Sequence, residues 1–220
     1  MITITLQQIE AHRPCVSGWA KVLKANGGAN ADRTQPFALA SVLDSNDLDD
    51  TLWCLKCLPE YGAVWRLYAV WCARQIQHLM VDQRSIRALD VATNYALDQA
   101  TRTDLAAAYA YAREAAREAA REAAYADATA DATADATADA TADATADAAA
   151  RTDSAYAAYA AAVPYAAAAT AATAATATAT AATAAATAAT AAARKKHVDM
   201  IRRVLNADAP LDEIKAALNV

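Results

Sequence analysis

The sequence predicts an all-α fold, and three observations support this prediction. Alanine dominates residues 104–193, and alanine has the highest helix propensity because it loses no side-chain entropy on ordering. Helix breakers are scarce, with four Gly and five Pro in 220 residues. Apolar residues in the N-terminal part recur at helical spacing. We therefore expect a small N-terminal helical domain over 1–103, a long alanine-rich antiparallel helical hairpin over 104–207 and a short C-terminal capping helix over 208–220.

In the N-terminal domain, apolar stripes alternate with turn and breaker residues. These stripes predict helices over 5–12, 16–25, 37–43, 47–58, 63–81 and 85–99. The fifth of these segments is apolar on more than one side, so we expect it to be central. The sixth is expected to bury Ile86, Leu89, Tyr95 and Leu97.

The alanine-rich region predicts two long helices joined by a turn. The first covers 105–125, with Thr103 as its N-cap and Asp104 in its first turn, where a negative charge suits the helix dipole. After a break that we place within 150–165, the second helix continues to Arg194. Its threonines alternate between three- and four-residue spacing, which is a heptad pattern. We expect the two helices to lie antiparallel at close range, because small side chains permit it.

A low-complexity repeat, Ala-Asp-Ala-Thr, fills residues 126–148. Aspartates at every fourth position advance by about 40° per step around a helix, so they do not form one straight stripe. Like charges four residues apart also repel by about 0.2–0.5 kcal/mol per pair. A calcium site is the alternative, but calcium needs six to eight converging oxygens. We interpret the repeat as a spacer.

The net charge of −5 is unevenly distributed along the chain. Residues 104–193 carry eleven carboxylates against four arginines, whereas residues 1–103 carry ten charges of each sign. The acidic rod argues against nucleic-acid binding. No membrane span is expected, because the second alanine run contains no Leu, Ile or Phe. No signal-peptide pattern precedes Pro14, so we expect a cytoplasmic location and reduced cysteines.

Cys54 and Cys57 have the Cys-x-x-Cys spacing of zinc and redox sites. They lie in an apolar helical segment without turn residues, and no second such pair exists. Buried reduced thiols are therefore the favoured interpretation, and metal binding by this pair stays open. No phosphate-binding loop and no arrangement of catalytic residues stands out, so we predict no cofactor, no metal site and no enzyme.

Arginines on two neighbouring predicted helices provide the candidate ligand-binding site. Together with two tryptophans, they would form a pocket for an anion such as a nucleotide. The competing interpretation is salt bridging to nearby carboxylates, among them Asp82 and Asp90. The predicted set is Arg66, Arg74, Arg84, Arg87, Trp65 and Trp71.

Three stretches of the N-terminal domain are distinctive: 42–55, 66–73 and 84–89. Together they resemble uncharacterised alanine-rich proteins of phages and prophages, which are similar to helical alanine-rich immunity-type proteins found near bacterial toxin genes. The resemblance covers about residues 3–120 and resumes near 194–205, whereas the Ala-Asp-Ala-Thr repeat is private to this chain. It implies a helical fold and a setting of phage or bacterial conflict. It carries over no catalytic residue.

Three functional hypotheses follow. The first is a non-enzymatic protein-interaction module, such as an anti-defence or immunity-type inhibitor, which contacts a host or toxin protein through its globular end and uses the rod for assembly. The second is a small-ligand binder for a nucleotide-like anion at the arginines above. The third is a structural rod that forms homo-oligomers.

Overall fold

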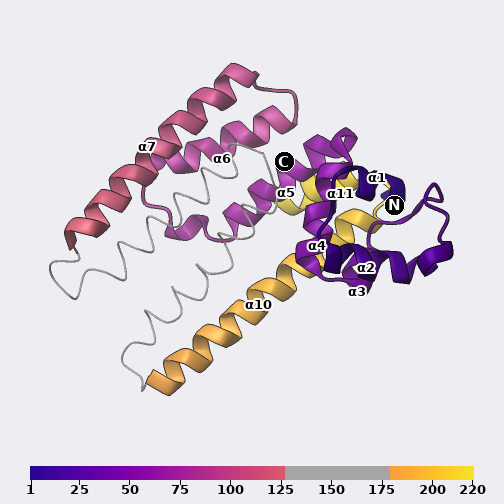
Figure 1. Cartoon of the computed structure of the whole chain (residues 1–220). Helices are drawn as coiled ribbons and strands as arrows, with labels where there is room; N and C mark the ends of the chain where they lie inside the picture. The colour runs from indigo at the N-terminus through magenta and orange to yellow at the C-terminus, as the bar shows by residue number, and fades with distance from the viewer. Residues whose placement is uncertain (127–178) are drawn as a thin grey trace. The chain divides into compact units, whose positions relative to one another are not determined.

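The computed structural model describes residues 1–126 and 179–220. The fold is all-α, as predicted. Besides the helices, the described residues form one sheet of two short strands. The chain divides into two compact units. Figure 1 labels the helices of both. The terminal unit comprises Met1–Val64 and Val198–Val220, and the middle unit comprises Trp65–His197. In the described ranges, no helix has both the length and the apolar character that crossing a bilayer requires.

The terminal unit is built from short helices with local caps. Its elements are β1 (Thr3–Ile4), α1 (Leu6–Ala11), α2 (Val16–Ala25), η1 (Gly28–Asn30), β2 (Phe37–Ala38), α3 (Ser41–Ser45), α4 (Leu48–Cys54), η2 (Leu55–Cys57), η3 (Pro59–Tyr61), the start of α5 (Gly62–Arg74), the end of α10 (Ala179–Asn206) and α11 (Pro210–Leu218). Thr5 and Gln8 form a capping box that starts α1. The helix predicted over 16–25 is confirmed, and Cys15 is its N-cap.

The predicted helix over 37–43 is wrong in its first half. Its first residues form β2, which pairs antiparallel with β1 so that Thr3 lies opposite Ala38. A helix begins only at Ser41. Pairing with β1, which is distant in sequence, overrides the local helix propensity of this segment. The residue pattern of the segment itself gives no information about that partner strand.

Two other predicted helices end early. The helix predicted over 47–58 stops at Cys54 and continues as the 3₁₀ turn η2. The helix predicted over 63–81 stops at Arg74, and the 3₁₀ turn η4 (Gln77–Leu79) follows it. Tighter turns at helix ends satisfy carbonyl groups that have no partner within the α-helix.

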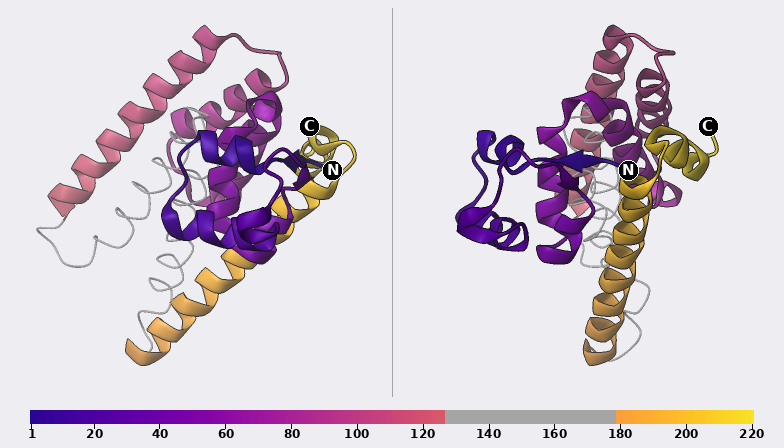
Figure 2. Two further views of the ribbon diagram at one scale, coloured as in Figure 1. Left: turned by 45° about the vertical axis from the view of Figure 1, so that its right-hand side comes forward. Right: turned by 90° about the vertical axis from the view of Figure 1, so that its right-hand side faces the viewer.

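Both ends of the chain meet in the terminal unit. The Ile2 N–H donates to the Leu205 carbonyl at 2.8 Å, and the N-terminal ammonium donates to the Ala207 carbonyl at 2.6 Å. Arg202 of α10 also pairs with Asp44 of α3 at 2.9 Å. Figure 2 shows the N-terminus beside the last turns of α10. Residues 198–220 therefore complete a core that the first 64 residues begin.

The middle unit contains the rest of α5, η4, α6 (Gln83–Ala96), α7 (Arg102–Ala126) and the described first part of α10. The prediction that the 63–81 segment is central is confirmed by the burial of α5. Its fully buried side chains, at 0% exposure, are Leu67, Tyr68, Val70, Cys72 and the alanines Ala69 and Ala73. Such burial on several faces of one helix is typical of a helix in the middle of a core.

α6 and α7 form an antiparallel pair, and they lie side by side in Figures 1 and 2. Arg84 at the start of α6 pairs with Glu118 far along α7. Between these ends, Ala88 packs against Ala112, and both are 0% exposed. Alanine on both helices lets the backbones approach closely. The first alanine-rich helix therefore packs against α6, a contact that the sequence did not predict.

The buried face of α6 differs from the predicted one. Of Ile86, Leu89, Tyr95 and Leu97, only Leu89 is buried, and the other three are half-buried. The buried residues are Ser85, Ala88, Leu89, Ala92, Thr93 and Ala96. Among them, Ala88 packs against Ala112 of α7, and the small side chains at this contact let the two helices lie close together.

The start of α7 also differs by two residues from the prediction. Thr101, not Thr103, caps the helix. Its hydroxyl accepts from the Asp104 N–H at 3.2 Å, and the Asp104 carboxylate accepts from the Thr101 N–H at 2.8 Å. This reciprocal pair is a capping box with aspartate in the second position.

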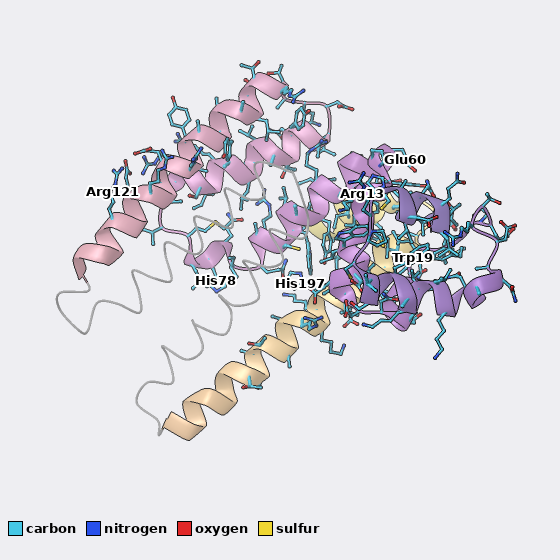
Figure 3. The ribbon with its side chains drawn as sticks, viewed as in Figure 1. Arg13, Trp19, Glu60, His78, Arg121 and His197 are labelled. Carbon is cyan, nitrogen blue, oxygen red and sulfur yellow. The ribbon has the colours of Figure 1, made fainter. Side chains whose placement is uncertain are left out.

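A buried histidine joins α5 to α10 within the middle unit. His197, which is 2% exposed, lies on α10 (Figure 3). Its Nδ1 is 3.3 Å from the Cys72 thiol, and the Trp71 ring meets it edge-on with 5.3 Å between centroids. Burial, and secondarily Lys196, lowers the pKa of His197 to about 4. At neutral pH the imidazole is therefore uncharged.

Several predictions concern residues outside the described ranges. These are the repeat beyond Ala126, the break within 150–165 and most of the threonine seam. The hairpin turn, the antiparallel pairing of the two alanine-rich helices and the boundaries at 103 and 207 stay predictions.

We expect the free energy of unfolding to fall as the pH drops from about 6.5 to about 4. The unfolded chain binds a proton at His197 with a pKa near 6.5, whereas the folded chain resists protonation down to about 4. Stability is therefore fully present above the unfolded pKa, and roughly 2–3 kcal/mol is lost across this window. Urea denaturation at a series of pH values measures it.

The control is His197→Gln, which cannot titrate. Between pH 6.5 and pH 4, the free energy of unfolding of this variant should fall by roughly 2–3 kcal/mol less than that of the wild type. An identical slope in both proteins would assign the acid sensitivity to carboxylates and not to this histidine.

Candidate functional site

A small apolar pocket opens in the terminal unit between α1, α2, α3 and α4. Its volume is about 70 Å³. It is lined by Ile9, Pro14, Cys15, Gly18, Trp19, Val22, Val42, Asn46, Asp50, Trp53 and Cys54. An apolar cavity with a few polar groups at its rim is the usual form of a binding site.

The polar rim is organised by Asn46. Its Nδ2 donates to Asp50 Oδ2 at 2.8 Å and to the Gly18 carbonyl at 2.9 Å, and so links α3, α4 and α2. Gly18 makes this approach possible: a Cβ there would lie 3.0 Å from both Asp50 carboxylate oxygens and from the Cys15 Sγ. In the described part of the chain, no ion pair neutralises the Asp50 carboxylate.

Cys15 stands exposed at the N-terminus of α2. Its Sγ accepts from the Gly18 N–H at 3.3 Å and lies 3.6 Å from the Ser17 Oγ. The Ser17 hydroxyl, and then the Gly18 N–H, lower the pKa of the Cys15 thiol, while Asp50 acts in the opposite direction. A lowered pKa increases the fraction of thiolate, which is the reactive form.

Two half-buried tryptophans form walls of the pocket. Trp19 lies on α2, as labelled in Figure 3, and the Arg33 guanidinium lies 5.6 Å from its ring centroid. Trp53 lies on α4, and the Lys56 ammonium lies 3.8 Å from its ring centroid. These cation–π contacts hold the indole rings in fixed orientations at the mouth.

The Cys-x-x-Cys pair does not belong to this polar rim. Cys54 and Cys57 are buried free thiols. Burial raises the pKa of Cys57 to about 11 and that of Cys54 further still. Both thiols are therefore protonated at neutral pH. Within residues 1–126 and 179–220, no three potential ligands of Cys, His, Asp or Glu cluster around a common point.

The predicted arginine–tryptophan set lies in the middle unit, and most of it is engaged elsewhere. The Arg66 guanidinium stacks 4.6 Å from the Tyr95 ring centroid. Arg74 pairs with Asp90 at 2.8 Å. Trp71 packs against Tyr68 and His197, and Trp65 is buried at 8% exposure.

The structure brings two members of that set together. Arg84 and Arg87 of α6 line one groove of about 440 Å³, with Ala88 and Val91. From α7 the groove is lined by Asp104, Ala107, Ala108 and Tyr111. We call these eight residues the α6–α7 face.

The two arginines of the α6–α7 face differ in their partners. Arg84 is held between Asp82, at 2.6 Å, and Glu118. Arg87 is exposed and has no ion pair or hydrogen bond within the described residues. Tyr111 is 64% exposed beside it.

The residues at the rim of the terminal-unit pocket were not identified from the sequence. None of Trp19, Trp53 and Cys15 belongs to the predicted arginine–tryptophan set. The available signal was the position of Cys15 directly before a helix, since an N-cap residue is solvent-facing and receives N–H groups.

Comparison with protein-family models, with curated proteins and with solved structures gave no match to the chain. The candidate sites therefore rest on the geometry described above.

We expect Cys15 to be the first thiol labelled when the native chain is treated with a thiol-reactive disulfide reagent. It is exposed with a lowered pKa, whereas Cys54, Cys57 and Cys72 are buried with raised pKa values. Stopped-flow absorbance should resolve one fast equivalent, followed by slow labelling limited by unfolding.

Cys15→Ser should remove the fast phase and leave the slow phase unchanged. A fast phase that survives this substitution would mean that one of the buried thiols is accessible in solution.

Proposed function

We propose that the chain is a non-enzymatic protein-interaction module that contacts its partner through the pocket of the terminal unit. The single observation that carries the proposal is an apolar pocket walled by two tryptophans and bordered by a carboxylate without a cationic partner among the described residues. Binding hot spots in protein interfaces are enriched in tryptophan and cluster around such pockets.

The residues that line the pocket indicate which side chains of the partner would bind in it. Val22, Val42 and Ile9 offer an apolar floor, which favours one aliphatic or aromatic side chain. Asp50 accepts a hydrogen bond from the neutral Asn46, so its charge is available to a lysine or arginine. The expected motif on the partner is an apolar residue next to a basic one.

The resemblance to alanine-rich phage and immunity-type proteins suggests what the partner is. In that setting it is a bacterial defence or toxin protein, and binding blocks its action. This setting rests on the resemblance alone, whereas the pocket and its chemistry do not depend on it.

The test is site-specific photo-cross-linking in cells that naturally carry the gene. Benzoylphenylalanine replaces Trp19, which is aromatic and half-buried, so the probe fits the site. The matched control carries the probe at Lys24, an exposed residue of the same helix that does not line the pocket. We expect a covalent adduct with a different protein from the Trp19 position and none from Lys24.

Substitutions then measure the two features of the pocket with the identified partner. Trp53→Ala should weaken binding by about 2 kcal/mol or more, as at a hot spot. Asp50→Asn should weaken it by up to about 1 kcal/mol and reduce its dependence on salt. Equal adducts at Trp19 and Lys24, or affinities unchanged by both substitutions, would exclude the pocket as the contact.

A second candidate function is binding of a nucleotide-like anion at the α6–α7 face. Arg84 and Arg87 line one groove beside the exposed ring of Tyr111, which favours a ligand with a phosphate and an aromatic base. Two of the predicted arginines, Arg66 and Arg74, and both tryptophans make other contacts and are not needed for it.

Isothermal titration with ATP and with pyrophosphate tests this candidate. If it holds, Arg87→Ala should weaken binding about tenfold, because a hydrogen bond to a charged group contributes about 1.5 kcal/mol. Arg113→Ala, on α7 but outside the face, should have no effect. No heat of binding at millimolar ligand would end this candidate.

A further inference from the structure

The α6–α7 face is an accessible apolar surface with charged groups at its two ends. Ala107 and Tyr111 are exposed, Val91 and Ala108 are half-buried, and they line a groove of about 440 Å³. Its residues recur at three- and four-residue spacing on both helices, which is the spacing of a bundle interior. The terminal-unit pocket shares no residue with this face.

The charges on the face are complementary to each other and lie toward opposite ends of it. Arg87, on the side of the face where Arg84 meets Glu118, has no ion pair within the described residues. Asp104, in the first turn of α7, receives both bonds from Thr101 on Oδ2, so Oδ1 has no hydrogen bond in the described part of the chain. In an antiparallel helix pair these residues lie at different levels along the groove.

We propose that the α6–α7 face binds the same face of a second copy of this chain, forming a four-helix bundle. A two-fold axis across the middle of the face, perpendicular to the helices, brings the Arg87 end of one copy to the Asp104 end of the other. Each copy then supplies one cation and one carboxylate, as an isologous contact requires. The alanines allow the two helix pairs to approach closely, and Tyr111 of each copy fills the centre.

The local charge balance favours a second copy over an anionic ligand. Asp82 and Glu118 already hold Arg84, which leaves Arg87 as the arginine of this face without a partner among the described residues. A multiply charged anion therefore meets one available cation, with a carboxylate, Asp104, in the same groove. A second copy meets one matched charge at each end and apolar groups between them.

The expected dimer is weak. The face is short, because it spans about two helical turns, or roughly 10 Å, along each helix. A face of this length buries less than the area of about 800 Å² per partner that is usual in stable interfaces. Association should therefore depend on concentration over about 1–300 µM, and high salt should weaken it.

The test is a charge swap in the full chain, measured by sedimentation equilibrium. Wild type should show a monomer–dimer equilibrium. Arg87→Glu should weaken dimerisation at least about tenfold, because the new carboxylate then faces Asp104 of the other copy. Asp104→Lys should do the same, and the double variant R87E/D104K should restore the wild-type constant within about threefold, since the pairs are reversed and again opposite.

Asp104 also caps α7, so a second pair of variants avoids the cap. Tyr111→Asp places a charge at the centre of the face and should give a monomer, whereas Ala110→Asp, exposed on the same helix but outside the face, should leave the dimer unchanged. A wild type that is monomeric throughout the range overturns the proposal. So does a dimer that withstands both Arg87→Glu and Tyr111→Asp, or a monomer that binds ATP through Arg87.

Discussion

The closure of the chain's two ends upon each other is the constraint on which the rest of the structure depends. The Ile2 N–H reaches the Leu205 carbonyl, the N-terminal ammonium reaches the Ala207 carbonyl, and both Ile2 and Leu205 are fully buried. A core made in this way is non-local, and everything from Trp65 to His197 is an insertion between its two halves. Loop-closure entropy grows only with the logarithm of length, at about 0.6 kcal/mol per doubling.

The slow growth of loop-closure entropy with length bears on the low-complexity repeat. In sequence, the repeat over 126–148 lies between the two segments that form the terminal unit. Lengthening the insertion therefore adds little free energy to the closure. The described part of the insertion has its own packing, since α6 and α7 pair through alanine and α5 meets α10 at Cys72 and His197.

Local features of the fold could be predicted from the sequence, and non-local ones could not. The helix over 16–25 and the buried character of α5 follow from periodicity and breakers within one segment. β2 was missed because its partner strand is distant in sequence, and the face of α6 was assigned by side-chain size although an alanine helix covers it. Of the predicted arginines, only Arg84 and Arg87 line the same groove. Arg66 stacks on the ring of Tyr95, and Arg74 forms an ion pair with Asp90. The pocket around Cys15 depends on the close approach of Asp50 to Gly18, which is possible because glycine has no Cβ. This contact joins two helices, and residue spacing within one helix does not predict it.

The meeting of the two chain ends also has a consequence for biosynthesis. The first 64 residues are synthesised well before Leu205, and at roughly 5–20 residues per second the delay is about 7–28 seconds. During that interval Ile2 lacks the carbonyl that its N–H requires and the neighbours that bury it. The terminal unit can therefore complete its fold only once Leu205 and its neighbours have been synthesised, while α6 and α7, adjacent in sequence, can pair earlier on the nascent chain.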